Sequence, residues 1–157
     1  MTTAVLFVCT GNTCRSPMAA GAMRTLVRRA GLEAAFEIDS AGIAVRAAGQ
    51  PPSPLALEAA ARRGHDIAAH RSRQLTPEDL VRAAHPLAMT AAHLAAMRAL
   101  APPGLADRPL MFLDRDVADP WGGTVRDYEA ALDLIEAGCA RLFDRLRAGH
   151  MLRSLEK

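Results

Sequence analysis

Short apolar runs alternate along the chain with longer segments in which apolar residues recur at helical spacing. A short apolar run bounded by turn residues is typical of a strand buried on both faces, and the longer pattern is typical of an amphipathic helix. The pattern predicts strands over residues 4–8, 36–39, 86–89 and 110–113. It predicts helices over residues 17–30, 55–64, 91–100 and 126–148, and a short helix that begins at Thr76-Pro77. Gly31 and Gly64 stand where the first two helices are expected to end.

Strands and helices that alternate in this way favour an α/β fold. Connections between parallel strands are right-handed, so the alternation predicts a doubly wound, four-stranded parallel sheet with helices on both faces. Apolar residues from Tyr128 to Leu146 recur at core-facing spacing, and Cys139 lies among them, which predicts that this cysteine belongs to the core. No internal repeat or linker interrupts the pattern, and we expect one domain over residues 1–157.

The first strand runs into a loop of small residues that carries the most distinctive chemistry of the chain. The loop leads into the first helix and reads Cys9-Thr10-Gly11-Asn12-Thr13-Cys14-Arg15-Ser16-Pro17. We expect Ser16 as the helix cap and Pro17 at the first helical position. Backbone N–H groups of such a loop and the positive end of a helix dipole bind an anion. Cys9 ends the strand, where ligands of α/β sheets bind, and the same positive field predicts a thiol of low pKa. Arg15 offers a planar fork for two phosphate oxygens.

Two other interpretations of this loop are weaker. A lone cysteine in an apolar run is usually a small buried hydrophobe, yet Cys9 begins a polar loop with an arginine six positions on. A nucleotide-binding P-loop needs Gly-Lys-Ser/Thr before its helix, whereas this chain has Cys14-Arg15-Ser16 and a single glycine in the loop. We therefore interpret the loop as a phosphate-binding loop between the first strand and the first helix, with a nucleophilic thiol at its floor.

Composition and charge narrow the class of protein without indicating a partner. The chain has 157 residues, of which 50% are hydrophobic and 23% charged, which is typical of a globular domain with a sizeable core. A formal net charge of +2 and dispersed arginines give no reason to expect nucleic acid. No apolar run reaches the length of a membrane span and no signal peptide is evident, so we expect a cytoplasmic protein without a membrane partner. Three cysteines, two of them in the loop, fit a reducing compartment.

Asp119 is a second candidate catalytic residue. A carboxyl group fixed by the following Pro120, on a loop after the last strand, is able to donate a proton to a leaving group and to take one from water. Asp-Pro pairs also start many turns, so the residues alone leave both roles open. His70 by itself is more often a structural histidine than an acid–base catalyst, and we expect it to support the loop.

The loop from Cys9 to Pro17 resembles the signature of the low-molecular-weight protein tyrosine phosphatase family. The resemblance covers essentially the whole chain, because three further segments are similar to family segments: Asp119-Pro120-Trp121-Gly122-Gly123, Ser40-Ala41-Gly42 and residues 70–76. It implies that Asn12 adopts a strained left-handed conformation supported by Ser16, Ser40 and His70. It also implies that the residues which bind phosphate are Thr10, Gly11, Asn12, Thr13, Cys14, Arg15 and Ser16.

The resemblance further implies a two-step phosphoryl transfer without metal or other cofactor. The Cys9 thiolate attacks phosphorus, Arg15 and the loop amides hold the phosphoryl oxygens, and Asp119 protonates the leaving atom. Asp119 then draws a proton from the water that attacks the phosphocysteine, and Ser16 stabilises the departing thiolate. Phosphorylated proteins are the implied substrates, and inorganic phosphate is a product.

Thr13 decides between two substrate classes. Within the family, tyrosine phosphatases usually carry a larger apolar residue at this position and protein arginine phosphatases carry threonine, so the chain resembles the bacterial arginine phosphatase branch. We expect phosphoarginine in proteins as the substrate, with protein phosphotyrosine as the alternative. Trp121, in place of the usual tyrosine or phenylalanine, is expected to form one wall of the substrate pocket.

Three further interpretations concern the cysteines and the acid. Cys9 and Cys14 lie in one loop and are able to form a disulfide that switches the nucleophile off, unless Cys14 only packs. Thioredoxin-coupled arsenate reductases are similar in fold and loop, but they relay oxidation through further cysteines, and only Cys139 remains here. A non-enzymatic phosphoprotein-binding module would need neither Cys9 nor Asp119.

Overall fold

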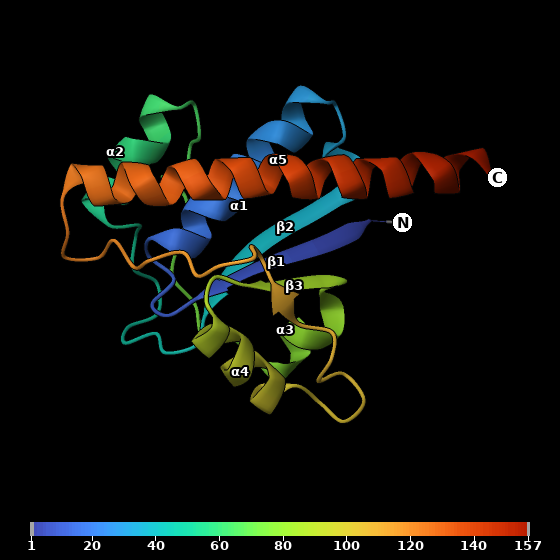
Figure 1. The fold of residues 1–157 in the computed structure, drawn as a ribbon, viewed down its shortest axis with the longest axis horizontal. Helices are drawn as coiled ribbons and strands as arrows, with labels where there is room; N and C mark the ends of the chain where they lie inside the picture. Colours follow the sequence, from blue (N-terminus) through green and yellow to red (C-terminus); the bar gives the residue numbers. More distant parts are fainter. Residues whose placement is uncertain (1, 157) are drawn as a thin grey trace.

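The computed structural model describes residues 2–156 and contains a four-stranded sheet with the strand order β2-β1-β3-β4 (Figure 1). All neighbouring strands are parallel, and the strands are β1 (Thr3–Cys9), β2 (Phe36–Gly42), β3 (His85–Ala88) and β4 (Leu110–Met111). The helices are α1 (Arg15–Arg29), α2 (Pro54–Arg62), α3 (Pro77–Arg82), α4 (Ala91–Leu100) and α5 (Val125–Leu155), and a 3₁₀ turn, η1, covers Glu33–Ala35. The predicted doubly wound α/β architecture is confirmed.

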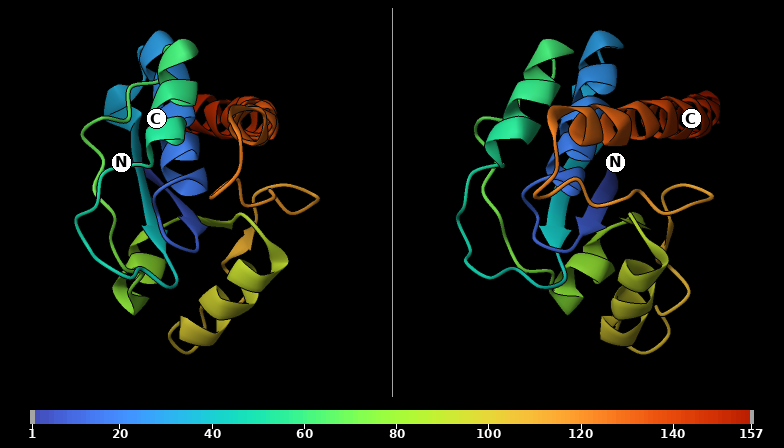
Figure 2. Two further views of the ribbon diagram at one scale, coloured as in Figure 1. Left: turned by 90° about the vertical axis from the view of Figure 1, so that its left-hand side faces the viewer. Right: turned by 60° about the vertical axis from the view of Figure 1, so that its left-hand side comes forward.

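Side chains of β1 alternate between two cores, because successive strand residues point to opposite faces of a sheet. Val5 and Phe7 pack with α1, α2 and α5, whereas Leu6 and Val8 pack with α3 and α4. Figures 1 and 2 show the same division, with α1, α2 and α5 on one side of the sheet and α3 and α4 on the other. Both faces of β1 are therefore covered, which explains why its sequence is an apolar run and not an alternating one.

The predicted start of the first helix is wrong at a place that matters for chemistry. Helix α1 begins at Arg15 with Cys14 before it, so Ser16 is not the cap and Pro17 is not the first helical residue. The chain enters the helix directly from the loop around the Cys9 sulfur, and the Ser16 hydroxyl lies 2.9 Å from that sulfur. No side chain caps the first turn. Its N–H groups therefore remain available to an anion.

Strand β4 is also shorter than the pattern predicts. It spans only Leu110–Met111, whereas the apolar run predicts a strand over residues 110–113. Phe112 and Leu113 leave the sheet but stay buried against α5, where they approach so closely that a Cβ on Gly138 would collide with both. Packing against α5 therefore overrides the strand pattern and directs the chain into the loop that precedes α5.

The remaining helix ends follow the sequence with small differences. Gly31 and Gly64 have φ values of +68° and +81° just after α1 and α2, in the left-handed region that glycine adopts without strain. Helix α5 extends past the predicted end at residue 148, and most of the residues that it adds are exposed. Within residues 2–156, none of the helices combines the length and the apolar character that a bilayer span requires.

Candidate active site

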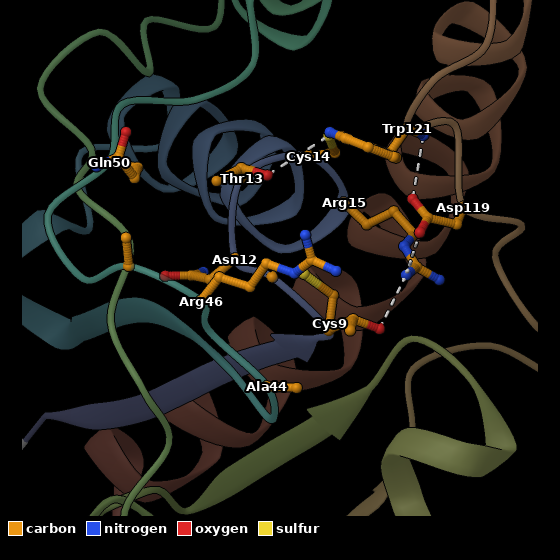
Figure 3. A pocket seen from close by; sticks show the side chains of 13 residues that line it. Cys9, Asn12, Thr13, Cys14, Arg15, Ala44, Arg46, Gln50, Asp119 and Trp121 are labelled. Atoms are coloured by element: carbon orange, nitrogen blue, oxygen red, sulfur yellow. Dashed lines mark hydrogen bonds and ion pairs between the residues drawn. The ribbon is translucent and has the colours of Figure 1, made fainter.

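The loop between β1 and α1 folds around the Cys9 sulfur at the carboxyl edge of the sheet (Figure 3). Parallel pairing places Cys9 opposite Gly42 of β2, beside the start of the loop at Thr10. Gly42 leaves no room for a side chain, because a Cβ there would lie 2.5 Å from the carbonyl oxygen of Thr10. The segment Ser40-Ala41-Gly42, which the sequence singles out, therefore lies directly against the base of the phosphate-binding loop.

Asn12 adopts the left-handed conformation in the middle of this loop, with a φ of +58°, and is fully buried. Its side-chain oxygen accepts a hydrogen bond from the backbone N–H of Arg73 at 3.0 Å, which fixes the orientation of the amide. Its Nδ2 donates to Ser16 Oγ at 2.8 Å and to Ser40 Oγ at 3.0 Å. His70 Nε2 donates to the carbonyl oxygen of Asn12 at 2.7 Å. The structure thus brings the three supports that the resemblance implies into contact with Asn12.

The Ser16 hydroxyl lies against the Cys9 sulfur. Ser16 Oγ accepts the hydrogen bond from Asn12, so its own hydrogen is available to donate along the 2.9 Å contact to Cys9 Sγ, and a hydrogen bond donated to the sulfur favours a thiolate. Burial has the opposite effect and raises the pKa of the Cys9 thiol, and the bonds from Ser16 and the charge of Arg15 lower this pKa only in part. The low pKa that the sequence predicts is therefore wrong for this structure. Sequence reasoning counted the positive field of the loop and omitted the desolvation of a residue that is 2% exposed.

Arg15 and Asp119 meet at the pocket although they are far apart in the sequence. One terminal nitrogen of the buried Arg15 guanidinium donates to the carbonyl oxygen of Val117 at 2.9 Å. The other lies 3.5 Å from Asp119 Oδ2 and 3.4 Å from Thr10 Oγ1. Asp119 is exposed, and its Oδ1 accepts from the backbone N–H of Trp121 at 3.1 Å. The predicted nucleophile, cation and carboxyl group therefore line one pocket.

Three segments of the chain form the walls of this pocket. The lining residues are Cys9 to Arg15 from the phosphate-binding loop, Ala44, Arg46, Ala47 and Gln50 from the segment after β2, and Asp119 and Trp121 from the loop before α5. Figure 3 shows Thr13 and Trp121 on the same side of the pocket, with Arg46 extended across it. Trp121 is 71% exposed, which leaves the indole available to a substrate. Arg46 adds a second positive charge to the one on Arg15.

Sequence reasoning missed several residues of this site. Arg46 and Gln50 lie in a segment rich in glycine and proline, which predicts a loop but does not indicate that the loop folds over Cys9. His93, in the first turn of α4, lies with its Nε2 2.7 Å from Thr10 Oγ1. No motif marks His93, and only the crossover that places α4 near the end of β1 brings this residue to the loop.

The other two cysteines lie in different surroundings. The Cys14 sulfur lies 3.2 Å from Ser53 Oγ and 3.4 Å from the hydroxyl of Tyr128, and these two oxygens are 3.2 Å apart. Burial and the neighbouring Cys14 raise the pKa of Tyr128 to about 12, so the phenol stays protonated at neutral pH. Cys139 is fully buried in α5, as predicted, with its sulfur 3.6 Å from the carbonyl oxygen of Ala19. Cys9, Cys14 and Cys139 are all free thiols that form no disulfide in this structure.

Comparison with known proteins relates this arrangement to a family. The family profile described as low molecular weight phosphotyrosine protein phosphatase matches residues 4–151. The chain is 40% identical over 149 residues to the protein-arginine-phosphatase of Geobacillus stearothermophilus, which covers 91% of this chain and 95% of that protein. It is 35% identical over 150 residues to a putative low molecular weight protein-tyrosine-phosphatase of Synechocystis, which covers 90% of this chain and 95% of that protein. The crystal structure of YfkJ from Bacillus subtilis superposes with a TM-score of 0.88 at 32% identity, covering 95% of this chain and 97% of that one. The chain therefore belongs to the low-molecular-weight phosphotyrosine protein phosphatase family and is a cysteine-dependent protein phosphatase, a hydrolase.

Proposed function

We propose that the protein hydrolyses phosphoarginine in proteins through a phosphocysteine at Cys9. One arrangement carries the proposal: the Cys9 sulfur, the Arg15 guanidinium and the Asp119 carboxyl group line one pocket that also includes Thr13 and Trp121. In this scheme the loop holds the phosphoryl group, Arg15 pairs with its oxygens, and Asp119 donates a proton to the leaving group. No metal or other cofactor takes part.

In the first step Cys9 releases its thiol proton to solvent and attacks phosphorus as the thiolate, and the bond from phosphorus to the leaving nitrogen breaks with its electron pair staying on nitrogen. Arg15 and the N–H groups of the loop offset the negative charge on the phosphoryl oxygens. Asp119 enters this step protonated and donates to the nitrogen. The arginine side chain of the substrate therefore leaves as a guanidinium.

In the second step a water molecule attacks the phosphocysteine, and the bond from phosphorus to sulfur breaks. Asp119, now a carboxylate, takes a proton from this water, which restores the carboxyl group for the next turnover. The Ser16 hydroxyl donates to the departing sulfur along its 2.9 Å contact and stabilises the thiolate. Inorganic phosphate is released.

Thr13 and Trp121 are the residues that we assign to substrate choice. Thr13 is half-buried and lines the pocket, so a larger aliphatic side chain in its place changes the space beside the phosphoryl group. The flat guanidine group of phosphoarginine stacks well on an indole, and Trp121 presents an exposed one. Relatives of both substrate classes are similar to the chain, so the choice of phosphoarginine over phosphotyrosine rests on these two residues.

Release of phosphate from phosphoarginine and phosphotyrosine proteins by the wild type and by Thr13→Ile tests the substrate class. We expect the wild type to act faster on phosphoarginine, and Thr13→Ile to shift the ratio toward phosphotyrosine by about tenfold or more. p-Nitrophenyl phosphate, assayed in parallel, reports the phosphoryl chemistry without either natural side chain. A wild type that prefers phosphotyrosine would refute the assignment of phosphoarginine. An unchanged ratio in Thr13→Ile would remove Thr13 from substrate choice.

Cys9→Ser tests the nucleophile. The hydroxyl group of serine ionises far less readily than a thiol, so we expect turnover of phosphoarginine and of every phosphate ester to fall to background. Cys139→Ala is the matched control, because Cys139 is buried in the core between α5 and α1, and its kcat should equal that of the wild type. Full activity of Cys9→Ser would rule out a phosphocysteine.

We also propose that Cys9 and Cys14 form a reversible disulfide under oxidising conditions. Peroxide converts the Cys9 thiolate into a sulfenic acid and is itself reduced, and the Cys14 thiol then closes the disulfide with release of water. We expect peroxide-treated protein to lose activity, to show a Cys9–Cys14 link by mass spectrometry and to recover with dithiothreitol. Cys14→Ala should lose activity irreversibly under the same treatment. Absence of the link, or failure of the wild type to recover, would contradict this switch.

A further inference from the structure

A hydrogen-bonded pair beside the phosphate-binding loop includes a histidine that the mechanism above leaves unused. Thr10 follows Cys9 and lines the pocket. Its Oγ1 lies 2.7 Å from Nε2 of His93, which belongs to the first turn of α4, and 3.4 Å from a terminal nitrogen of Arg15. His93 is 3% exposed. The pair therefore links a helix on one face of the sheet to the loop that leads into α1 on the other face.

The position of the hydrogen on His93 follows from its surroundings. Burial and the nearby charge of Arg15 lower the pKa of His93 to about 4, so the ring is neutral at pH 7 and carries a single N–H. Its Nδ1 has no hydrogen-bond partner within the described part of the chain, whereas Nε2 faces Thr10. A buried N–H without a partner is more costly than a bare acceptor atom without one. The hydrogen therefore belongs on Nε2, which donates to Thr10 Oγ1.

This assignment determines what the Thr10 hydroxyl is able to do. A hydroxyl group accepts two hydrogen bonds and donates one. Thr10 Oγ1 receives hydrogen bonds from His93 and from Arg15, which use both of its acceptor positions. Its hydrogen is left to donate, and Thr10 lines the pocket together with Cys9 and Arg15.

We propose that Thr10 donates a hydrogen bond from its hydroxyl to a phosphoryl oxygen of the substrate, and that His93 is the positioning residue that keeps this hydroxyl oriented as a donor. The inference rests on the proposed function, because it adds a side-chain donor to the loop N–H groups and Arg15. Negative charge gathers on the phosphoryl oxygens during transfer, so a donor held in advance stabilises the transition state more than the bound substrate. Thr10 therefore contributes mainly to kcat.

Thr10→Val, which keeps the shape of the side chain and removes the hydroxyl, tests the donor. We expect kcat for p-nitrophenyl phosphate to fall about 10- to 100-fold, and orthovanadate to bind more weakly by a similar factor. Trp121 is the single tryptophan of the chain and lines the pocket, so its fluorescence reports vanadate binding without turnover. Thr10→Ser retains a hydroxyl and should lose much less in both measurements.

Variants of His93 test the positioning role. His93→Leu leaves no donor and should lose nearly as much kcat as Thr10→Val, whereas the amide N–H of His93→Gln lies near the place of Nε2 and should restore most of it. The double variant Thr10→Val/His93→Leu should be no worse than Thr10→Val alone, because His93 acts through Thr10. Thr25→Val is the matched control. It removes a buried hydroxyl 2.8 Å from His65 Nδ1, away from the pocket, and should lower the melting temperature with kcat unchanged.

Three results would overturn the inference: wild-type kcat and vanadate affinity in Thr10→Val, additive losses in the double variant, or an equal loss of kcat in Thr25→Val. The last would mean that the effect comes from a loosened fold. Failure of the proposed function has a different signature, because the wild type would then bind vanadate but fail to release phosphate from phosphoarginine proteins. In that case the vanadate affinities of the Thr10 and His93 variants still decide whether the hydroxyl is a donor.

Discussion

Lowering the pH from 7 to 5 adds protons to an unfolded histidine before it adds them to His93 in the folded protein. Burial and the positive charge of Arg15 lower the pKa of His93 to about 4, and the carboxylates of Asp119 and Asp116 oppose this effect only in part. An unfolded histidine has a pKa of about 6.5. Protons therefore bind preferentially to the unfolded chain between these values, so the stabilisation is complete above pH 6.5 and declines as the pH falls toward 4.

The size of the effect follows from the two pKa values. At pH 5 an unfolded imidazole is about 1.5 pH units below its pKa while the folded one is still neutral, which corresponds to about 2 kcal/mol of unfolding free energy. The expected contribution of His93 to the unfolding free energy over this range is therefore about 1–2 kcal/mol. Burial also lowers the pKa values of His70 and His85, and these residues act in the same direction. The share of His93 therefore has to be isolated by substitution.

Urea unfolding of the wild type and of His93→Gln between pH 7 and pH 5 measures this share. Glutamine does not titrate and still directs an N–H toward Thr10, so the variant should lose about 1–2 kcal/mol less than the wild type over this range. An NMR titration of the His93 ring C–H signals should show no protonation above about pH 5. Parallel stability profiles for the two proteins, or a His93 ring that titrates near 6.5, would refute the reasoning.

Three further outcomes concern the loop and its pocket. Asn12→Ala removes two donated hydrogen bonds and leaves the half-buried N–H of Arg73 without its acceptor, so urea unfolding should show a loss of about 2–4 kcal/mol; an unchanged unfolding free energy would contradict this. Gly42→Ala would bring a Cβ to 2.5 Å from the carbonyl oxygen of Thr10, so the loop must shift, and kcat for p-nitrophenyl phosphate should fall about tenfold or more. A variant with wild-type kcat would show that the loop is not held there. Arg46→Ala removes a positive charge from the pocket, and KM for phosphate esters should rise about two- to fivefold at low salt and less at high salt. A KM increase that is independent of salt would mean that Arg46 acts through shape and not through charge.

The order of the elements was predictable because it depends on local patterns. Apolar runs and helical periodicity report which residues face a core, and the whole alternation of strands and helices follows from them. The phosphate-binding loop was predictable for the same reason, because the residues from Cys9 to Pro17 are contiguous. Their order alone predicts a turn that leads into a helix. Gly31 and Gly64 mark helix ends because only glycine enters the left-handed region without cost.

The predicted element boundaries were wrong where contacts outside the helix or sheet compete with the local pattern. Ser16 and Pro17 read as a cap and a first helical residue, yet the helix starts earlier because the hydroxyl of Ser16 is engaged by Cys9 and Asn12. Phe112 extends an apolar run that reads as strand, yet it leaves the sheet to pack against α5. In both cases the local pattern identifies the residues correctly as polar or buried, but it does not give the geometry of their contacts.

What the sequence by itself determined is therefore the fold class and the chemical character of the loop, with the pair Cys9 and Arg15 at its two ends. Only the tertiary structure decided that Asp119 reaches Arg15, that Arg46 lies over the pocket and that His93 holds Thr10. The tertiary structure also decided the direction in which the pKa of Cys9 is shifted. Each of these properties depends on which atoms, remote in sequence, surround a group and exclude water from it, and local patterns carry no record of that.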